Sequence, residues 1–357
     1  MTNKNLEIQG NSTKEVKILS ASEVRPVLLA SFYSSAYPVR AAFLESNWSW
    51  INRAYYISNR IPLVLISDEK VIAHAGLIPL TMRVRGMNHS AAWFIDLAVL
   101  PEYQRAGYGS ILVRKRMEFA EIQMTFPNKR SMGIFEKLGW HLYPDSYMHY
   151  IFLKPFNYPS IKKWLPGHLR ALLNKVFFLF RKRFYLRNSL PGGSVNLEIV
   201  SPGSLEVFLR AYNNAPNTAS EEVVILRDDD FIQWRVLNSP NRKQYYIYSS
   251  GEFYALVYFN NRTGDSIDIL LMSDESNNEQ IKTMLSSLVS KGEREGYSFI
   301  RLFTTRESLT AFIRRNVRSF VKQRAFVYYS KNQSILESMK NLPWRLGLID
   351  SDFEFTN

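Results

Sequence analysis

The sequence has 357 residues, 46% of them hydrophobic, which is enough for two or three ordinary domains with sizeable cores. It contains no cysteine, which excludes a disulfide framework, a zinc–thiolate site and a cysteine nucleophile. The formal net charge is +13, a balance that favours polyanionic partners such as a nucleic acid or an anionic membrane face.

The first hundred residues predict helices followed by strands. Residues 1–20 are polar and lack the apolar core of a secretory signal. No stretch of the chain reaches the roughly 18 uncharged apolar residues of a membrane-spanning helix, so we expect a cytoplasmic or membrane-peripheral protein. Residues 23–58 have a helical, aromatic-rich pattern. Strands separated by polar turns are predicted for residues 61–67, 71–86 and 90–99.

A glycine-containing loop, PEYQRAGYGSIL, follows the last of these strands. In it, Gly107 and Gly109 can take positive φ angles or approach a ligand closely. A helix is expected over residues 110–121, and its first turn carries unpaired N–H groups and a partial positive charge. The loop therefore suits a pyrophosphate, with Arg105 beside it, or is a plain strand-to-helix turn. Its spacing fits neither the dinucleotide-binding fingerprint nor a Walker loop.

The residues around this loop resemble the acyl-CoA signature of the GNAT acetyltransferase superfamily. That signature is Gln/Arg-x-x-Gly-x-Gly/Ala after a strand and a Pro turn, and Gln104, Gly107 and Gly109 fill its positions. A second element, Pro127-Asn128 followed by SMGIFEKLGWHLY, is similar to the family's later Asn, helix and Leu-Gly-aromatic segment. The resemblance covers residues 20–155. It implies an α/β (α+β) fold with a mixed, largely antiparallel GNAT sheet flanked by helices.

The resemblance also implies a co-substrate and the residues that bind it. GNAT enzymes transfer an acetyl group from acetyl-CoA to an amine, so acetyl-CoA is the expected co-substrate. The backbone of Leu97 and Val99 would contact the thioester and pantetheine arm, and Asn128 would lie near that arm. The two strands that hold the arm must splay apart to admit it. The pyrophosphate would be held by the loop residues Gln104, Arg105, Ala106, Gly107, Tyr108, Gly109 and Ser110.

Two residues of the inner strands are candidates for the general base. Asp96 alternates with Leu97 along its strand and so faces the opposite side of the sheet, where it could take a proton directly or through water. His74 is the second candidate, and His89, at a hairpin edge, is weaker. The structural alternatives are an ion-paired carboxylate for Asp96 and a satisfied core histidine for His74. No histidines and carboxylates have metal-ligand spacing, so no metal is expected.

The general acid is the point at which this sequence departs from the family. Many GNAT enzymes have a tyrosine four residues before the glycine of the Leu-Gly-aromatic segment, where it can protonate the leaving thiolate. Phe135 holds that position before Gly139. Because phenylalanine cannot donate a proton, Tyr143 or Tyr147 substitutes for it, or water does, or the thiolate leaves unaided.

The middle of the chain is strongly basic. Residues 146–197 contain no Asp or Glu, and apolar residues recur there at three- and four-residue steps, which predicts a helix with one apolar face. The sequence leaves three interpretations of this helix open. Its apolar face packs on protein, or residues 160–187 lie on an anionic bilayer, or the cations bind nucleic acid, which is the least favoured of the three. Residues 191–194 read as a linker. The cations are Lys154, Lys162, Lys163, Arg170, Lys175, Arg181, Lys182, Arg183 and Arg187.

The second half repeats the order of strands, helix, strand, helix and strand. No Gln-x-x-Gly-x-Gly motif follows its predicted strand at residues 266–273, so we infer a degenerate GNAT-like domain and one donor site per chain. Trp234 and Trp344 are expected to fill the core. The expected domains are an acyl-CoA-binding GNAT domain at 1–155, the basic helix and linker at 156–194, the degenerate domain at 195–345 and a tail at 346–357.

The favoured function is an acyl-CoA-dependent N-acyltransferase acting on a small or lipid-linked amine, such as an amino sugar of a surface-polysaccharide pathway. One alternative is an aminoacyl transferase that uses aminoacyl-tRNA, which the net charge suits. Another is a non-catalytic acyl-CoA-binding regulatory module, which Phe135 allows. The retained Gln104, Gly107 and Gly109 favour CoA over tRNA.

Overall fold

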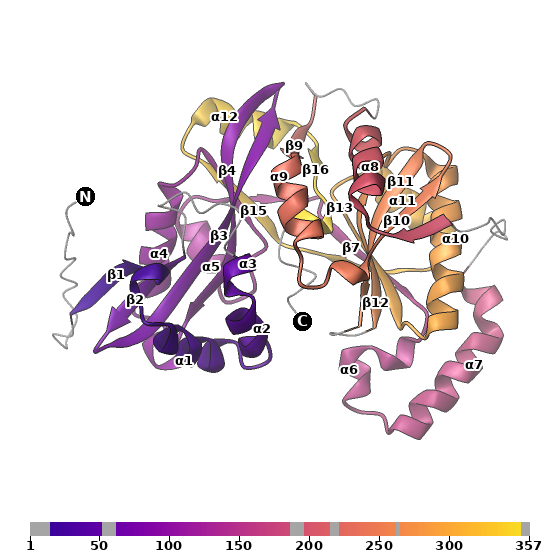
Figure 1. Ribbon diagram of the computed structural model, residues 1–357, viewed down its shortest axis with the longest axis horizontal. Coiled ribbons are helices and arrows are strands. Elements are labelled where there is room, and N and C mark those ends of the chain that lie inside the picture. The colour runs from indigo at the N-terminus through magenta and orange to yellow at the C-terminus, as the bar shows by residue number, and fades with distance from the viewer. Residues whose placement is uncertain (1–14, 52–61, 186–195, 215–220, 262–264, 351–357) are drawn as a thin grey trace. The chain divides into compact units, whose positions relative to one another are not determined.

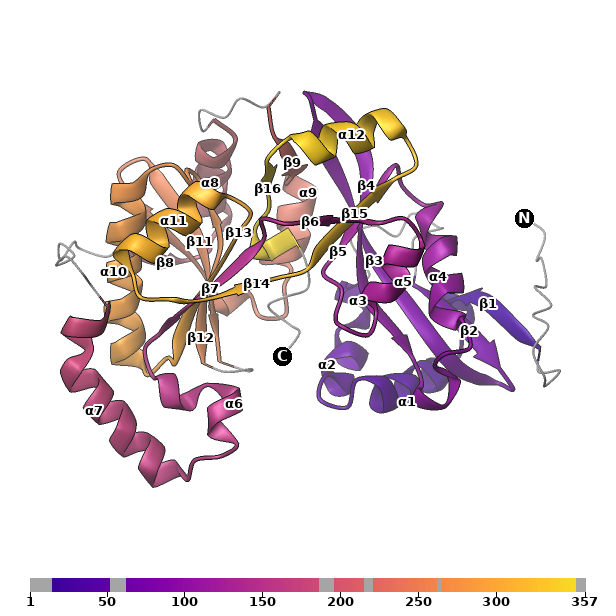
Figure 2. The same ribbon diagram turned by 180° about the vertical axis from the view of Figure 1, so that it is seen from behind.

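The computed structural model describes residues 15–51, 62–185, 196–214, 221–261 and 265–350, and its elements are drawn in Figures 1 and 2. The chain divides into two compact units, and each takes three separate segments of the sequence. Unit 1 consists of Met1–Pro144, Ile225–Trp234 and Ala325–Leu342, and unit 2 of Asp145–Val224, Arg235–Arg324 and Pro343–Asn357.

Unit 1 is built on a mixed sheet whose main path of seven strands includes one parallel pair. Its strands lie in the order β1 (Val16–Ser20), β2 (Leu63–Ser67), β3 (Lys70–Val84), β4 (Met87–Val99), β5 (Ile122–Thr125), β15 (Phe326–Ser330) and β6 (His141–Tyr143). The parallel pair is β4 and β5. All other neighbours in this order are antiparallel, as the sequence predicts.

Helices cover both faces of this sheet. Successive strand residues point to opposite faces, so Val64 packs with α1 (Pro26–Ala36) and α2 (Ala41–Ser46), whereas Leu65 packs with Leu112 of α4 (Tyr108–Met117). The remaining helices and turns of unit 1 are η1 (Ala21–Glu23), α3 (Trp48–Ile51), η3 (Pro101–Tyr103), α5 (Met132–Lys137), α9 (Asp229–Ile232) and α12 (Gln333–Asn341).

Unit 2 has a second sheet with the same pattern of strand directions. Its order is β14 (Phe320–Gln323), β7 (Tyr147–Phe152), β13 (Phe299–Thr304), β12 (Ser266–Met272), β11 (Phe253–Asn260), β10 (Tyr245–Ser250) and β8 (Asn196–Ile199). Only β12 and β13 are parallel, and the other neighbours are antiparallel. The two sheets confirm the expected mixed, largely antiparallel fold with tandem GNAT-like units.

The core of unit 2 lies between its sheet and two amphipathic helices, α10 (Asn278–Glu295) and α11 (Glu307–Asn316). None of the helices described in either unit combines the length and the hydropathy needed to cross a membrane. The other elements are η4 (Pro155–Asn157), α6 (Pro159–Lys162), α7 (Gly167–Tyr185), α8 (Pro202–Asn214), β9 (Val223–Leu226), η6 (Arg242–Gln244), β16 (Trp344–Arg345) and η7 (Leu348–Asp350), with a π-helical turn, η5 (Gln233–Leu237), after α9.

The two units exchange one strand each. β7 follows the first half in sequence but pairs with β13 and β14 in unit 2, whereas β15 lies near the end of the chain and pairs with β5 and β6 in unit 1. The exchanged strands occupy the same place in the two orders, between the second strand of the parallel pair and the edge strand (Figure 2). The units are therefore not the consecutive segments 1–155 and 195–345 expected from the sequence.

Candidate active site at the glycine loop

The glycine loop turns from β4 into α4 through a left-handed residue. Gly107 has φ 84° and ψ −4° and is the N-cap of α4, which begins at Tyr108 rather than at residue 110. No atom lies within 4 Å of the position of a Cβ at Gly107, so the backbone angle, and not space, requires glycine here. The exposed loop leaves the first N–H groups of α4 open to an anion.

Gly109 serves close packing instead. It is buried, and a Cβ there would lie 2.9 Å from Cδ1 of Ile134 on the neighbouring α5. The two glycines of the motif thus have different physical roles: Gly107 permits the turn, and Gly109 lets α4 approach α5.

The other loop residues lie around this turn. Gln104 reaches back to the strand, where its Nε2 donates to the carbonyl oxygen of Val99 at 2.9 Å. Arg105 also has a positive φ of 68° and, like Ala106, is exposed. Tyr108 and Ser110, in the first turn of α4, are half-buried. Gln104 therefore fixes the loop to the end of β4, while Arg105 carries the charge on its outer side.

The strands β4 and β5 separate directly beside the loop. Their parallel pairing covers residues 91–93 and 122–124, and beyond it the Thr125 hydroxyl donates to the Phe94 carbonyl at 3.0 Å. Asp96 then has a φ of 49°, and the β3–β4 register shifts at this point, which is the pattern of a β-bulge. Leu97 and Val99 lie beyond the bulge on the diverging part of β4. The resemblance to GNAT enzymes led us to expect that these two strands separate.

Asp96 is held in an ion pair. Its side chain is 5% exposed, and Oδ1 lies 2.8 Å from Nη1 of Arg40, the N-cap residue of α2. The Arg40 guanidinium thus already occupies one oxygen of the Asp96 carboxylate. The bulge and the ion pair together give Asp96 a positioning role at the divergence of the strands.

His74 connects the bulge to helix α1. Its Nδ1 lies 2.9 Å from the backbone carbonyl of Asp96, and its Nε2 lies 3.2 Å from the hydroxyl of Tyr33. A carbonyl oxygen only accepts hydrogen bonds, so the neutral ring carries its proton on Nδ1, and Nε2 accepts from Tyr33. Burial lowers the pKa of His74 below its usual value, which keeps the ring neutral.

A pocket of about 640 Å³ has Tyr33 in its wall. It is formed by η1, α1, α2 and α3, and apolar side chains such as Val24, Leu29 and Trp48 line much of it. Glu45 is its carboxylate. The Tyr33 and His74 side chains thus join this pocket to the β4 bulge. Sequence reasoning missed Tyr33 and Arg40, because only the fold brings α1 and α2 to residues of β3 and β4.

Asn128 has a local structural role in this structure. Its side-chain Oδ1 accepts from the backbone N–H groups of Arg130 and Ser131, at 2.9 Å each, and so caps the turn that precedes α5. Asn128 lies three residues after the end of β5, and its side-chain oxygen is engaged in this turn.

The structure does not bring Tyr143 to the bulge. Tyr143 is on β6, and two strands, β5 and β15, lie between β6 and β4, a separation of about 14 Å at the usual strand spacing. Phe135 is buried in an aromatic cluster with Phe94 and Trp140, with ring centroids 6.4 and 4.7 Å away. Tyr147 belongs to unit 2, where its hydroxyl donates to Asp145 at 3.3 Å.

His89 lies away from these groups. Its Nδ1 is 3.6 Å from a carboxylate oxygen of Glu121, beside the β3–β4 hairpin. In the described parts of the chain, no three His, Asp or Glu side chains gather as a metal site would require.

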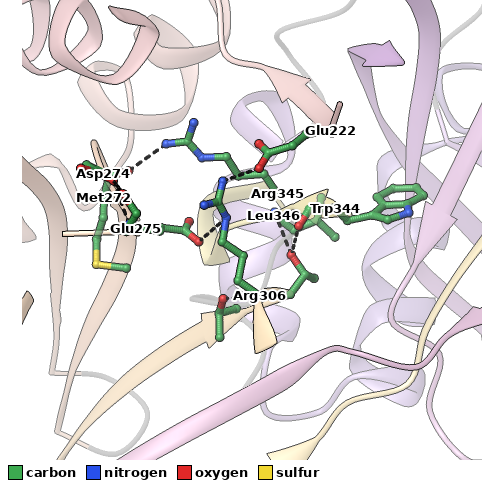
Figure 3. Close-up of polar contacts among 12 residues, drawn as sticks. Glu222, Met272, Asp274, Glu275, Arg306, Trp344, Arg345 and Leu346 are labelled. Carbon is green, nitrogen blue, oxygen red and sulfur yellow. Dashed lines mark hydrogen bonds and ion pairs between the residues drawn. The ribbon is translucent and has the colours of Figure 1, made fainter. Parts of the chain in front are cut away.

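In unit 2 the parallel strands are β12 and β13. Other segments of the chain cover the carboxyl ends of these two strands (Figure 3). β16 pairs with Val223 and Val224, and Arg345 Nη2 donates to the carbonyl of Ser273 at 3.0 Å, just after β12. The Thr305 hydroxyl, just after β13, donates to the Trp344 carbonyl. Trp344 is fully buried, as expected, and Trp234 in unit 1 is buried with 5% of its surface exposed.

An ion pair network lies in the same region of unit 2, after β12 and β13. Arg306 lies 2.7 Å from a carboxylate oxygen of Glu222 and 3.3 Å from one of Glu275 (Figure 3). A Cβ at Gly347 would lie 2.5 Å from the backbone oxygen of Leu270, so the C-terminal segment lies directly on β12. This packing, together with the missing glycine loop, distinguishes unit 2 from unit 1.

Comparisons with known proteins agree with this architecture. Residues 27–140 match the acetyltransferase (GNAT) family. No protein of curated function matches the sequence. Solved structures with a similar fold include GCN5-related N-acetyltransferases from Kribbella flavida (TM-score 0.56, 13% identity, 92% of this chain and 74% of that chain) and Anabaena variabilis (TM-score 0.58, 13% identity, 90% and 74%).

A third similar structure is Saccharomyces cerevisiae N-myristoyltransferase with bound myristoyl-CoA, at a TM-score of 0.52 and 13% identity over 92% of this chain and 85% of that chain. At these identities the structures show the fold, while the sequence match covers the segment that contains the glycine loop and the β4 bulge. Residues 27–140 of this chain therefore match the GNAT family, and the chain as a whole has a fold similar to these acyltransferase structures.

Proposed function

We propose that this protein is an acyl-CoA-dependent N-acyltransferase that transfers an acetyl group from acetyl-CoA to an amine. The observation that carries the proposal is the glycine loop at the start of α4, directly beside the point where β4 and β5 separate. Backbone N–H groups at a helix start bind phosphates, and diverging strands leave room for an extended arm. An amino sugar of a surface-polysaccharide pathway remains the proposed acceptor.

The residues of the loop fit the donor. The N–H groups at the start of α4 would bind the pyrophosphate, and the exposed Arg105 would add a full positive charge. The backbone of Leu97 and Val99 would contact the pantetheine arm. Because Gln104 already occupies the Val99 carbonyl, the N–H groups of this strand are the groups left to act on the donor.

The pocket beside Tyr33 is the proposed acceptor site. Its apolar walls would hold the body of the acceptor, and Glu45 would attract the cationic amine as it arrives. The nitrogen attacks as the neutral amine, so one proton must leave it before or during the attack. The new C–N bond forms as the C–S bond of the thioester breaks, and the electron pair of that bond leaves with sulfur.

Tyr33 and His74 are suited to take the proton of the amine. The Tyr33 hydroxyl gives its proton to Nε2 of His74 and receives the proton of the amine, and the resulting imidazolium donates to Tyr33 and to the Asp96 carbonyl. Asp96 stabilises this cation through its negative charge and holds the bulge in place. The sulfur takes its proton from water, because Phe135 cannot supply one.

The first test is calorimetric titration of acetyl-CoA into the wild-type protein and a Gly107→Glu variant. A glutamate at this position adds negative charge beside the pyrophosphate and strains the positive φ, so we expect measurable binding to fall by at least 100-fold. Gly86→Glu is the matched control, because Gly86 also has a positive φ, 77°, and open space around it.

The control separates backbone strain from loss of the site. Equal loss of binding in both variants would mean that the effect comes from general destabilisation. Absence of acetyl-CoA binding in the wild-type protein would contradict the proposal, and binding without turnover over a panel of amines would favour a regulatory acyl-CoA-binding module.

A further inference from the structure

Helix α7 of unit 2 exposes an apolar stripe. Leu172, Val176 and Leu179 are spaced at i, i+4 and i+7, so they share one face, and their exposed fractions are 57%, 43% and 77%. On the inner side, Leu173 is half-buried and Phe177 packs against the core of unit 2. The apolar band of the helix is therefore wider than the surface that unit 2 covers.

The turn before α7 continues this surface. Trp164 is 85% exposed, and Lys162 and Lys163 beside it are exposed as well. Figure 1 shows α6 and α7 at the margin of unit 2, away from its sheet. We call this the α6–α7 surface, defined as Lys162, Lys163, Trp164, Leu172, Lys175, Val176 and Leu179.

A groove of about 650 Å³ runs along α7 next to this surface. Three cations line it, Lys154, Arg170 and Lys175, together with the carboxylate of Glu293. Lys154 donates to the Gly296 carbonyl at 3.0 Å. Arg170 has a buried Nε with no hydrogen-bond partner among the described residues, so a group that accepts from it would remove an unsatisfied donor.

We propose that the α6–α7 surface binds the anionic phospholipids of a bilayer, with a headgroup phosphate in the groove beside Arg170. Exposed Leu and Val side chains gain by entering the acyl boundary, and tryptophan favours the interface. Lysines and arginines add attraction to anionic headgroups. The absence of Asp and Glu from residues 146–197 makes this charge uniform along the segment. Nucleic acid would neutralise the cations but leave the apolar stripe exposed to water.

The test is sedimentation of the full-length protein with vesicles of phosphatidylcholine alone and of phosphatidylcholine with phosphatidylglycerol. We expect binding only to the anionic vesicles. Leu172→Gln with Leu179→Gln, and separately Lys162→Glu with Lys163→Glu, should each lower the partition coefficient at least tenfold. Because all four side chains are exposed, the variants should fold, which circular dichroism and thermal unfolding check.

Two further variants make the test specific. Ile199→Gln with Phe320→Gln removes exposed apolar groups elsewhere on unit 2, at 54% and 51% exposure, and should leave vesicle binding unchanged. Arg170→Met should reduce the preference for the anionic lipid while leaving the apolar stripe intact. Equal binding to both vesicle types, no binding to either, or unchanged binding in the α6–α7 variants would overturn the proposal. Binding of tRNA that depends on the same lysines, without vesicle binding, would also overturn it.

Discussion

Tyr33 and His74 meet through one hydrogen bond of 3.2 Å between residues far apart in the sequence. If this contact carries the proton from the acceptor amine, Tyr33→Phe should lower kcat about 100-fold, in the range typical of general acid–base catalysis. The affinity for acetyl-CoA should not change, because neither Tyr33 nor His74 is among the proposed donor contacts. Steady-state kinetics with a reactive amine, combined with calorimetry, measure both quantities.

Tyr37→Phe is the control for this variant, because Tyr37 follows the same helix and also packs edge-on against Phe32. The pH profile gives a second check. His74 must be neutral to take a proton, and burial lowers its pKa, so the wild-type rate should persist below the ordinary histidine pKa of about 6.5. Similar kcat values for Tyr33→Phe and the wild type would rule out the relay.

His149 makes the stability of unit 2 depend on pH. It is fully buried on β7, and burial lowers its pKa to about 4. Its unfolded pKa is about 6.5, so the unfolded chain binds the extra proton between these values. The free energy of unfolding should therefore be at its full value above pH 6.5 and should fall by about 3 kcal/mol as the pH falls toward 4.

Chemical denaturation at several pH values between 4 and 7 should show this loss. His149→Gln should flatten the slope, because glutamine does not titrate and retains hydrogen-bonding groups for Ser319 and Thr310. His168→Gln changes an exposed histidine and should leave the slope as in the wild type. A wild-type slope in His149→Gln would assign the effect to other groups.

The conformation of single residues in the glycine loop could be predicted from the sequence because it is set locally. The positive φ of Gly107 and the link from Gln104 to Val99 arise within a few residues. Asp96 and His74 were found as candidates, but their roles depend on Arg40 and Tyr33. These partners come from helices whose docking no local pattern encodes, so the choice between catalysis and structure needed the fold.

At the scale of elements, the segment 343–350 closes the end of the parallel pair in unit 2. Gly347→Ala would place a Cβ 2.5 Å from the Leu270 oxygen, which belongs to backbone and cannot move aside easily. We expect a loss of about 1–3 kcal/mol in the free energy of unfolding, the usual range for overpacking. Denaturant titration monitored by circular dichroism measures it.

Gly133→Ala is the matched control for Gly347→Ala. Gly133 is in helix α5, with a φ outside the left-handed region and no atom within 4 Å of a Cβ, so alanine there should be neutral or stabilise by up to about 1 kcal/mol. A Gly347→Ala protein as stable as the wild type would show that the segment does not pack tightly on β12.

Most elements were readable from the sequence, since the strands 266–272 and 299–304 and the helix ending before Gly296 follow clear periodicities and turn residues. α4 is shorter than predicted, ending at Met117. The sequence did not predict that Trp344 and Arg345 cover the ends of β12 and β13. A two-residue strand has no periodicity, and its partner strand lies about a hundred residues away in the sequence.

At the scale of the whole molecule, the exchange of β7 and β15 makes each unit depend on the other half of the sequence. The pattern of strands could be predicted, but strand partners are set by long-range pairing, which the local pattern of β7 and β15 does not encode. The proposed donor site therefore lies in a unit whose sheet is complete only when residues 326–330 have paired with β5 and β6.

Val327→Asp tests this dependence in the full-length chain. Val327 is 1% exposed and packs with Phe94, Phe135 and Trp140 beneath α4 and α5, so an unpaired carboxylate there should destabilise unit 1 by about 3–5 kcal/mol. Acetyl-CoA should then no longer raise the melting temperature, although the glycine loop is unchanged. Leu142→Asp is the control, because Leu142 pairs with Val327 across the sheet but is 54% exposed. If Val327→Asp retained wild-type donor binding and stability, unit 1 would not require the exchanged strand, and residues 1–144 would fold around the site without it.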